Sequence, residues 1–396
     1  MSNRSLAGNV KSKATPSRDK IPFTKPYLTG RELAYVQKAI ESGKLGSGGP
    51  FLQACEKWLQ DNTKCKMAFL TTSGTTALEF SALVHDIGPG DEVIMPSFTF
   101  VSTANAFVLR GATPVFVDIR QDTLNMDETK IEAAISAKTK AIVPVHYAGV
   151  ACEMDAIKDI AADHKLAIVE DAAQTANATY KGHPLGSIGS VGAISFHETK
   201  NIVAGEAGAL LVNDETLIDR AITIRDKGTN RRRMLLGETD KYTWVDVGSN
   251  YFPSELAAAF LLAQLEASNE ITSDRLRLWS RYHLALRDLE TLGQVTLPHA
   301  PEHCAHNGNI FFVLLPTRMH RDTCLKALND AGISAMFHFT PLHSSPAGTK
   351  FGRSSGDLSV TEDTAGRLLR LPLFVGMTDE VQDYIVETLA SVTSGL

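Results

Sequence analysis

An apolar strand pattern passes into a polar loop in the stretch Ala193-Ile194-Ser195-Phe196-His197-Glu198-Thr199-Lys200-Asn201, which is followed by Gly205 and Gly208. The two glycines allow the backbone to approach a ligand closely. A lysine held in such a loop can lose its proton and attack a carbonyl carbon, whereas most loop lysines are simply solvated. Lys200 is therefore a candidate nucleophile, and the surrounding motifs decide between these two interpretations.

A second motif lies 200 − 171 = 29 residues upstream, where the apolar run Ala167-Ile168-Val169 ends in Glu170 and Asp171. A carboxylate at the end of a strand can pair with the protonated ring nitrogen of a cofactor, or it can cap the next helix. Neighbouring side chains of a strand point to opposite faces, so only one of the two acids faces a given site. We expect this acid to be Asp171.

A third motif, Ser73-Gly74-Thr75, enters a helix predicted over residues 75–85. Backbone N–H groups at a helix N-terminus, together with two hydroxyls, can bind a phosphate, although a plain N-cap uses the same residue types. Ser195 is a further candidate phosphate donor. A Schiff-base lysine, an acid for a pyridinium nitrogen and a phosphate cradle are the protein parts that pyridoxal 5'-phosphate (PLP) requires. The three motifs together predict PLP as the cofactor, with Lys200 and Asp171 as catalytic residues.

Aromatic and histidine residues after two predicted strands add candidate contacts. Phe98 and Phe100 follow the strand Glu92-Met95, and either ring can stack on a cofactor or pack in the core. His338 and His343 lie in a polar–aromatic loop and are candidate substrate-binding residues, with a structural hydrogen bond as the alternative. The cysteines are scattered without metal-ligand spacing, so we expect no metal site.

Short apolar runs alternate with helical patterns from residue 67 to residue 212. The runs lack clean polar alternation and are spaced by helices, which predicts an α/β fold with a mostly parallel sheet covered by helices. Ligands of such sheets bind at the carboxyl ends of the strands. All three motifs fall at such ends, so we expect them to meet in one site.

The chain divides into two predicted domains after a polar tail. Residues 1–20 are rich in polar and basic side chains, which predicts a disordered tail. Residues 21–253 form the predicted large PLP-binding domain, which begins with helices. Residues 254–396 comprise a bridging helix over 254–292 and a smaller C-terminal α+β domain. The elements expected in this smaller domain are strands at 309–315 and 334–339 and helices at 321–331, 361–369 and 378–394.

Composition excludes several classes of function. The 396 residues carry a net charge of −6, so there is no electrostatic reason to expect nucleic acid as a partner. No apolar run approaches the roughly 18–20 residues of a membrane span, and no apolar stretch near the N-terminus indicates a secretion signal. The five cysteines, odd in number, fit a reducing compartment. We therefore expect a cytoplasmic enzyme that is not attached to a membrane.

The motifs resemble those of the DegT/DnrJ/EryC1/StrS family of sugar aminotransferases, a branch of the fold type I PLP enzymes. The resemblance covers roughly residues 21 to 394 and is most specific over residues 72–78, 96–105, 170–174 and 195–201. Within this family, the chain is most similar to the transaminases that form dTDP-4-amino-4,6-dideoxygalactose for enterobacterial common antigen. The stretches that match them are 144–155, 240–244 and 338–343.

The resemblance implies roles around the cofactor ring. Lys200 would form the Schiff base and shuttle protons, and Asp171 would hold the pyridine nitrogen. Gln174 would contact the region of the ring hydroxyl, and Phe100 would stack on the ring.

The resemblance also implies how the phosphate is bound. Gly74, Thr75 and Ser195 would hold it from within the chain. Asn250 matches a family asparagine that reaches the phosphate of the other subunit, so the resemblance implies a homodimer with shared active sites.

The implied function is PLP-dependent transfer of an amino group, from L-glutamate, to C4 of a dTDP-linked 4-keto-6-deoxy sugar in surface-polysaccharide biosynthesis. The partners would be the nucleotide sugar and the amino-acid donor. Two alternatives remain: an aminotransferase for a 3-keto nucleotide sugar, and a non-catalytic PLP-binding regulatory protein. The joint presence of Lys200, Asp171 and the phosphate motif counts against the second.

Overall fold

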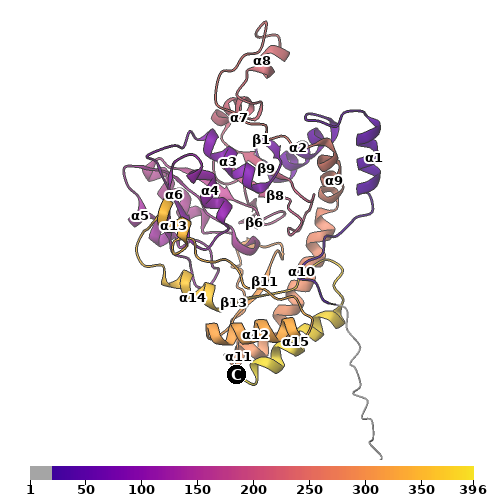
Figure 1. The fold of residues 1–396 in the computed structure, drawn as a ribbon, viewed down its shortest axis with the longest axis vertical. Helices are drawn as coiled ribbons and strands as arrows, with labels where there is room; N and C mark the ends of the chain where they lie inside the picture. Colours follow the sequence, from indigo (N-terminus) through magenta and orange to yellow (C-terminus); the bar gives the residue numbers. More distant parts are fainter. Residues whose placement is uncertain (1–19) are drawn as a thin grey trace, which may run out of the picture.

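Eight strands form the central sheet of the protein, whose computed structural model describes residues 20–396 (Figure 1). The strands lie in the order β1, β9, β8, β5, β4, β2, β3 and β12. Only β9 runs antiparallel to its neighbours, so the sheet is mostly parallel, as predicted. In the same order, the strands span Met67–Thr71, Gly208–Val212, Val191–Ser195, Ala167–Asp171, Thr139–Ile142, Glu92–Pro96, Thr113–Val117 and Arg353–Ser354.

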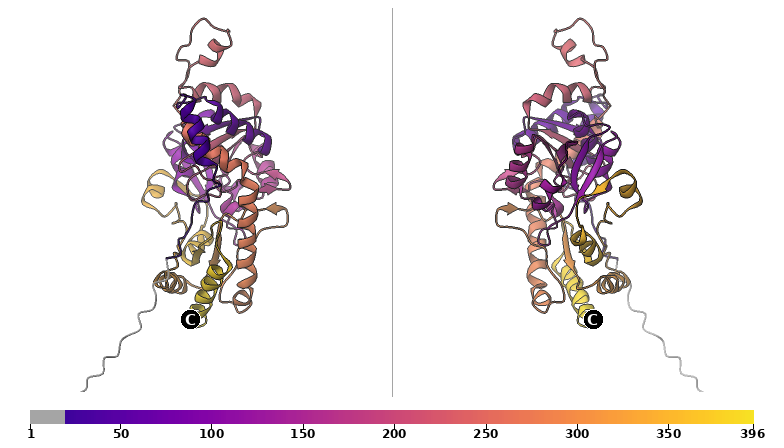
Figure 2. Two further views of the ribbon diagram at one scale, coloured as in Figure 1. Left: turned by 90° about the vertical axis from the view of Figure 1, so that its right-hand side faces the viewer. Right: turned by 90° about the vertical axis from the view of Figure 1, so that its left-hand side faces the viewer.

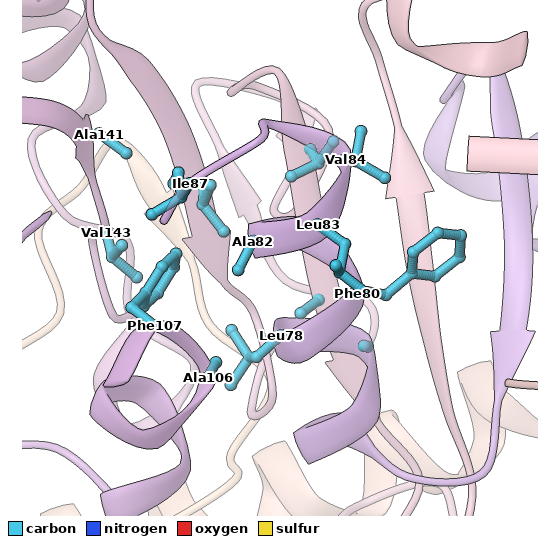
Figure 3. Packing of buried hydrophobic residues seen from close by; sticks show 14 of the residues in the cluster. Leu78, Phe80, Ala82, Leu83, Val84, Ile87, Ala106, Phe107, Ala141 and Val143 are labelled. Atoms are coloured by element: carbon cyan, nitrogen blue, oxygen red, sulfur yellow. The ribbon is translucent and has the colours of Figure 1, made fainter. Parts of the chain in front are cut away.

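Helices α3 (Gly74–Val84), α4 (Val101–Val108) and α7 (Ile218–Arg225) cover one face of the sheet. Figure 3 shows part of this layer, in which apolar side chains of α3 and α4 pack together. Within β2, Val93 faces this layer and Ile94 faces the opposite one. Such alternation between two apolar layers is expected of a strand that is buried on both faces.

The opposite face of the sheet is covered in two parts. Near β1 it packs against α2 (Pro50–Thr63) and α9 (Glu255–Glu266). Near β3 it packs against α5 (Ile131–Ala134) and α6 (Met154–His164). Helices on both faces leave the two ends of the strands as the accessible parts of the sheet, which is where ligands bind in such folds.

The chain after α9 builds a second, smaller unit. Helix α10 (Ser268–Ala285) runs from the sheet to this unit (Figure 2). There, β11 (Phe311–Leu314) and β13 (Leu368–Leu371) form a two-stranded antiparallel sheet. Helices α12 (Arg318–Asp330) and α15 (Asp379–Thr393) pack with this sheet around a separate apolar core.

The bridging helix predicted over residues 254–292 consists of three helices. Helices α9 and α10 are separated by Ala267, and α11 (Arg287–Thr291) follows α10 after Leu286. Both separating residues have ψ near 0°, outside the helical range, with ψ of 6° at Ala267 and 1° at Leu286. The stretch is helical as expected, but it is interrupted at Ala267 and at Leu286.

One predicted strand is wrong. Residues 334–339 contribute only a single bridge, between Met336 and Arg370. The strand that pairs with β11 is β13, whose first two residues fall within the helix predicted over residues 361–369. Helix α14 (Ser359–Arg367) ends directly before it. A short apolar run such as Leu368–Leu371 fits a buried strand and a buried helix turn equally well, so its pattern did not decide between them.

Residues 228–249 form an arm that extends from the body of the protein, at the top of Figure 1. The arm carries the short helix α8 (Arg231–Leu235), and its base is closed by a hydrogen bond from Val245 N to Gly228 O at 2.8 Å. Several of its apolar side chains are exposed, and Trp244 is 80% exposed. Exposed apolar groups gathered on one segment are typical of a contact surface for another chain.

The predicted tail over residues 1–20 lies outside the described residues, apart from Lys20. Within residues 20–396, no helix is long and apolar enough to cross a membrane. In that part of the chain, no three His, Cys, Asp or Glu side chains are grouped so as to hold a metal ion. The short elements not yet named are α1 (Glu32–Glu41), α13 (Pro346–Phe351), β6 (Thr179–Tyr180), β7 (His183–Pro184) and β10 (Cys304–Ala305).

Candidate active site

The three sequence motifs meet at one edge of the central sheet. Strands β5 and β8 end there at Asp171 and Ser195, and α3 starts there after β1. Because β9 runs in the opposite direction, it begins at the same edge. Its first residue, Gly208, pairs with Thr71 on one side and Ser195 on the other. Residues far apart in the sequence therefore form one corner of the sheet.

Gly74 and Gly208 make this corner of the sheet unusually tight, and we refer to it as the glycine corner. A Cβ atom on Gly74 would lie 2.7 Å from Cβ of Ser195, and one on Gly208 would lie 2.4 Å from the carbonyl oxygen of Ser73. Only glycine fits at either position. The first N–H groups of α3, those of Gly74 and Thr75, have no acceptor among the described residues. This helix N-terminus is therefore open to an anion such as a phosphate.

The hydroxyl groups of the corner are partly engaged within the protein. Ser73 Oγ accepts a hydrogen bond from Thr76 N at 3.1 Å, so this side chain is the N-cap of α3. Thr75 Oγ1 shares a hydrogen bond with Ser102 Oγ at 2.8 Å. Ser195 Oγ accepts only a long bond, from His197 N at 3.4 Å. The backbone of Ser73, rather than its hydroxyl, therefore shapes the corner, whereas Ser195 keeps its hydroxyl proton for a ligand.

Asp171 presents a buried carboxylate at the end of β5. Thr103 Oγ1 donates to its Oδ2 at 2.6 Å, and Ala173 N donates to its Oδ1 at 3.2 Å. Its backbone N–H donates to Pro144 O at 2.9 Å. A carboxylate can accept about four hydrogen bonds. Asp171 is thus held in a fixed orientation and can still accept an N–H from a ligand.

The neighbouring Glu170 is fully engaged elsewhere. Its oxygens accept backbone hydrogen bonds at 2.8, 2.7 and 2.6 Å from the turn that precedes β8. His146 Nδ1 accepts from Cys152 N at 3.1 Å, so its Nε2 carries the proton and donates to Glu170 at 2.9 Å. Glu170 therefore has no free acceptor position. The geometry favours Asp171 for the pyridine nitrogen. The three amide donors belong to Gly186, Ile188 and Gly189.

Lys200 lies in the loop between β8 and β9. The loop is closed by hydrogen bonds from Glu198 N to Gly205 O at 3.0 Å and from Ala204 N to Phe196 O at 2.8 Å. The Lys200 ammonium group has no hydrogen bond or ion pair with any described residue. Burial lowers the pKa of Lys200 to about 8, the charge of Asp171 opposes this shift, and the charge of Arg370 adds to it. The structure thus holds an amine that loses its proton readily beside a buried acid.

The residues predicted around the cofactor ring differ in how they are placed. Phe98 is buried against Tyr147 and Phe339, so it is a core residue. Phe100 is 58% exposed at the N-terminus of α4, and its ring is available for stacking. Gln174 Oε1 accepts from Ala148 N at 2.6 Å, which leaves its side-chain N–H groups for a ligand.

The two candidate histidines have different surroundings. His338 Nδ1 shares a hydrogen bond with Tyr147 Oη at 2.8 Å. Burial, together with the charges of Arg370 and Lys200, lowers the pKa of His338 well below its usual value. His343 is engaged at both ring nitrogens, with Ser97 Oγ at 2.7 Å and Glu362 Oε1 at 3.3 Å. His338 therefore lies within reach of the charges of the site, whereas the contacts of His343 are those of a structural residue.

No described contact brings Asn250 to the corner. Its backbone forms a bridge with Asp226 at the base of the arm, and its side chain is exposed. The next residue, Tyr251, anchors the segment by stacking on Phe80 with a centroid distance of 4.8 Å. The backbone of Asn250 is thus held in place, while its side chain has no partner among the described residues.

Sequence reasoning missed two residues of the site. Thr103 gives Asp171 its short hydrogen bond, and no local pattern distinguishes it from other helix threonines. Arg370 influences the pKa of both Lys200 and His338. A signal for Arg370 did exist, because an arginine interrupts the apolar run Leu368-Leu369-Arg370-Leu371. A charge inside an apolar run indicates a functional or paired group.

These residues fit PLP. The glycine corner leaves room that any Cβ would fill and presents free N–H groups to a phosphate. Asp171 offers a carboxylate to a ring nitrogen, and Phe100 offers an open aromatic face. Lys200 supplies an amine that is partly neutral near pH 8.

A model of the DegT/DnrJ/EryC1/StrS aminotransferase family matches residues 26–390. The chain belongs to this family. Its relatives include the spore coat polysaccharide biosynthesis protein SpsC of Bacillus subtilis (strain 168), which is 35% identical over 385 residues, 95% of this chain and 97% of SpsC. GDP-perosamine synthase of Caulobacter vibrioides is 35% identical over 379 residues, 94% of this chain and 98% of that protein.

A solved structure extends the comparison to the cofactor. The PLP form of Spr1654 from Streptococcus pneumoniae, described as a sugar aminotransferase, superposes with a TM-score of 0.87 at 27% identity and covers 95% of this chain and 99% of that one. The sugar aminotransferase described here therefore has the fold type I architecture and uses PLP. The predicted fold and cofactor are confirmed.

The pKa of Lys200 predicts how this aminotransferase recombines with PLP. With a pKa of about 8, about a tenth of Lys200 is neutral at pH 7, compared with about 0.03% for a lysine of pKa 10.5. The recombination rate of the apoprotein should therefore rise with a midpoint near pH 8, as measured by stopped-flow absorbance. Parallel runs with N-acetyl-lysine correct for the titration of PLP itself. A midpoint above pH 10 would contradict the environment described for Lys200.

Proposed function

We propose that this aminotransferase transfers an amino group from L-glutamate to C4 of a nucleotide-linked 4-keto-6-deoxy sugar, with dTDP as the nucleotide, in surface-polysaccharide biosynthesis. The observation that carries the proposal is a deprotonable Lys200 that feels the charge of the buried Asp171, beside the corner formed by Gly74 and Gly208. The likeness of three further stretches to the transaminases that form dTDP-4-amino-4,6-dideoxygalactose supports the choice of sugar. The name of SpsC, a polysaccharide biosynthesis protein, supports the pathway.

Each residue of the site has a separate role in the proposed reaction. PLP supplies an electron sink for the charge that develops on the carbon losing its proton. Asp171 would keep the ring nitrogen protonated, and the N–H groups of Gly74 and Thr75 would hold the phosphate. Lys200 Nζ takes the proton from the α-carbon of the amino-acid donor in the first half-reaction. In the second half-reaction it delivers a proton to C4 of the sugar.

Two nearby groups, His338 and Tyr147, are neutral near pH 7 and do not compete with Lys200 for this proton transfer. The pKa of His338 lies well below 6.5, so its imidazole is a weak base near pH 7. Burial raises the pKa of Tyr147, so its phenol stays protonated. Lys200 is thus the group near the site whose pKa lies close to the working pH, which is where general acid–base catalysis is most effective.

Product analysis by NMR tests the proposal. The protein, PLP and L-glutamate are incubated with dTDP-4-keto-6-deoxyglucose, with a GDP-linked 4-keto-6-deoxy sugar, or with a 3-keto nucleotide sugar. The GDP arm is included because one relative is named GDP-perosamine synthase. We expect an amine at C4 of the dTDP sugar. An amine formed only from the GDP-linked sugar would show that the nucleotide is not dTDP. An amine formed only from the 3-keto sugar would show that C4 is not the position of transfer. No amine in any arm would overturn the function.

We also propose that the enzyme is a homodimer with shared active sites. Asn250 is exposed on a fixed backbone, and the arm beside it carries exposed apolar side chains such as Trp244. Both features are explained if the arm packs on a second copy and Asn250 reaches the phosphate held there.

Mixing two impaired variants tests the shared site. Asn250→Ala should lower activity roughly 10- to 150-fold, because a hydrogen bond to a charged group contributes about 1.5–3 kcal/mol. Co-expressed Lys200→Ala and Asn250→Ala subunits, isolated with two tags, should recover activity, since one site of the mixed dimer has both residues intact. Co-expression of Lys200→Ala subunits with each other serves as the control. If the mixed species shows no gain over its parents, the site is built within one chain.

A further inference from the structure

Residues 306–310 connect the two parts of the protein close to the candidate active site. They follow β10, which pairs with β6 beside the large domain, and they precede β11 of the smaller unit. The turn that they form is buried, with Asn307 0% and Asn309 8% exposed. Polar side chains buried at such a boundary are expected to form hydrogen bonds, and the partners of these two residues lie in the site.

The side-chain amide of Asn307 binds the segment that carries Gln174. Its Nδ2 donates to Gln174 O and to Ala176 O, both at 2.8 Å. Its Oδ1 accepts from Asn309 N at 3.1 Å. Gly149 packs directly against this amide, and a Cβ atom at that position would collide with it. Both side-chain N–H groups of Asn307 are used within the protein, so it has none to offer a ligand.

Gln174 is consequently held at two points. Its backbone oxygen accepts from Asn307, and its side-chain Oε1 accepts from Ala148 N at 2.6 Å. A side-chain amide whose oxygen and backbone are both fixed keeps its N–H groups in one orientation. The Asn307 side chain therefore contributes to the direction in which Gln174 can donate a hydrogen bond.

Asn201 connects the same turn to the loop of Lys200. The Nδ2 of Asn201 donates to Asn307 O at 2.9 Å, and its Oδ1 accepts from Asn309 Nδ2 at 2.9 Å. Asn201 is 5% exposed and directly follows Lys200 in the chain. These bonds therefore restrain the backbone from which the Lys200 side chain extends.

The turn is itself anchored on α10. Arg275 Nε donates to Gly308 O at 3.0 Å, and its Nη2 donates to Asn309 O at 2.7 Å. Gly308 has a φ of 61°, and a Cβ atom there would lie 2.9 Å from Arg275 O. Only a glycine fits this close approach without strain. Connected hydrogen bonds in a buried region make the groups that they join rigid.

We propose that Asn307 is a positioning residue, which orients Gln174 directly and the Lys200 loop through Asn201. This inference rests on the part of the proposed function in which Gln174 and Lys200 face PLP. Groups that act on a cofactor must be held to within about 0.5 Å by the hydrogen bonds behind them. The competing interpretation is that the turn only joins the smaller unit to the large domain, in which case its loss would affect stability alone.

Three alanine variants separate positioning from stability. Asn307→Ala removes the bonds to Gln174 and Ala176, whereas Asn201→Ala removes only the link to the Lys200 loop. Asn213→Ala is the matched control. The Nδ2 of Asn213 also donates to two backbone oxygens, at 3.1 and 2.9 Å, but at the opposite end of β9 from Gly208. We expect both Asn307→Ala and Asn213→Ala to lower the melting temperature of the ligand-free protein.

Calorimetry with pyridoxine 5'-phosphate measures the effect on Gln174. This probe has an alcohol in place of the aldehyde, so its affinity does not depend on a bond to Lys200. Asn307→Ala should weaken binding roughly 3- to 12-fold, the range for one hydrogen bond between neutral groups. In a Gln174→Ala background the same substitution should weaken binding less than about 2-fold, because its effect passes through Gln174. Asn201→Ala and Asn213→Ala should bind the probe within about 2-fold of the wild type.

The pH dependence of recombination with PLP measures the effect on Lys200. Burial is the main cause that lowers the pKa of Lys200 from 10.5 to about 8. A loop that is no longer held admits water, so this pKa should rise. The midpoint of the recombination rate should accordingly move from near pH 8 to about pH 9 or above in Asn307→Ala and Asn201→Ala. It should stay near pH 8 in Asn213→Ala.

The outcomes are decisive in both directions. If Asn307→Ala lost stability like Asn213→Ala but kept the wild-type midpoint and probe affinity, the turn would be structural only. A loss of probe affinity that persisted in full without Gln174 would exclude the route through that residue. Should Asn307→Ala not fold, Asn201→Ala decides, and an unchanged midpoint would overturn the proposal. Neither assay contains a donor or a sugar, so a wild type that transfers no amino group from L-glutamate would refute the proposed function alone.

Discussion

Replacing Lys200 with alanine should abolish amino transfer, with turnover reduced at least about 10⁴-fold. Lys200 is proposed both to bind the cofactor and to move the proton, and no neighbour can replace it in either task. Arg370 stays protonated near neutral pH, since its pKa is about 10. His338 is too weak a base, because its pKa is well below 6.5. The glycine corner is untouched by the substitution, so the variant should still hold PLP without a covalent bond.

Borohydride reduction followed by mass spectrometry distinguishes the two forms. In the wild type, the peptide that contains Lys200 should gain the mass of the reduced cofactor, and in the variant no peptide should gain it. Lys181→Ala is the matched control, because Lys181 is an exposed lysine that pairs with Asp155. It should behave like the wild type in both assays. Turnover of Lys200→Ala at a near wild-type rate would remove Lys200 from the mechanism.

Asp171→Asn should lose at least about 10²-fold in rate while it retains visible cofactor. The amide oxygen of asparagine can still accept the hydrogen bond that Thr103 donates, so the local structure should persist. An uncharged amide, however, does not hold a proton on the ring nitrogen, and the electron sink is weakened. Steady-state kinetics measure the loss, and visible absorbance reports cofactor content.

Glu170→Gln provides the contrast for this prediction. Glu170 accepts three backbone hydrogen bonds and pairs with His146, and glutamine has one acceptor oxygen in place of two. We expect a loss of about 2–4 kcal/mol in the free energy of unfolding, with the remaining folded enzyme close to full activity. If Glu170→Gln lost rate and Asp171→Asn did not, the partner of the ring nitrogen would be Glu170.

Most of the sheet could be predicted from the sequence, because buried strands separated by helices leave a strong pattern. The strand ends at Asp171 and Ser195 followed from that pattern, and so did their meeting at one edge. Alternation of side chains along a strand implied that only one of Asp171 and Glu170 faces the site, and the hydrogen bonds of Glu170 in the structure favour Asp171. Local patterns predict where strands end and which face a side chain lies on, because both depend on which side chains of a single element are buried.

The remaining features depend on contacts between distant segments. The hydrogen bond from Thr103 to Asp171 joins residues 68 positions apart, and no local pattern reports it. The apolar face of α1 correctly predicted a helix, but Leu33 is 83% exposed, so the described part of the chain leaves this side chain uncovered. The effect of the Arg370 charge on Lys200 and His338 likewise joins segments that are far apart in the sequence. Side-chain patterns predict that a residue is buried, but not which residue lies against it.

The pairing of β1 has a consequence for how the protein is made. Among the strands of residues 20–396, β1 lies at the edge of the sheet and pairs with β9 alone, with Met67 opposite Val212. At about 5–20 residues per second, the ribosome needs roughly 7–30 s to make the 212 − 67 = 145 residues between them. During that interval the apolar strand Met67–Thr71 has no partner and is open to pairing with other nascent chains. The corner where Gly208 pairs with Thr71 and Ser195 is therefore completed late in synthesis.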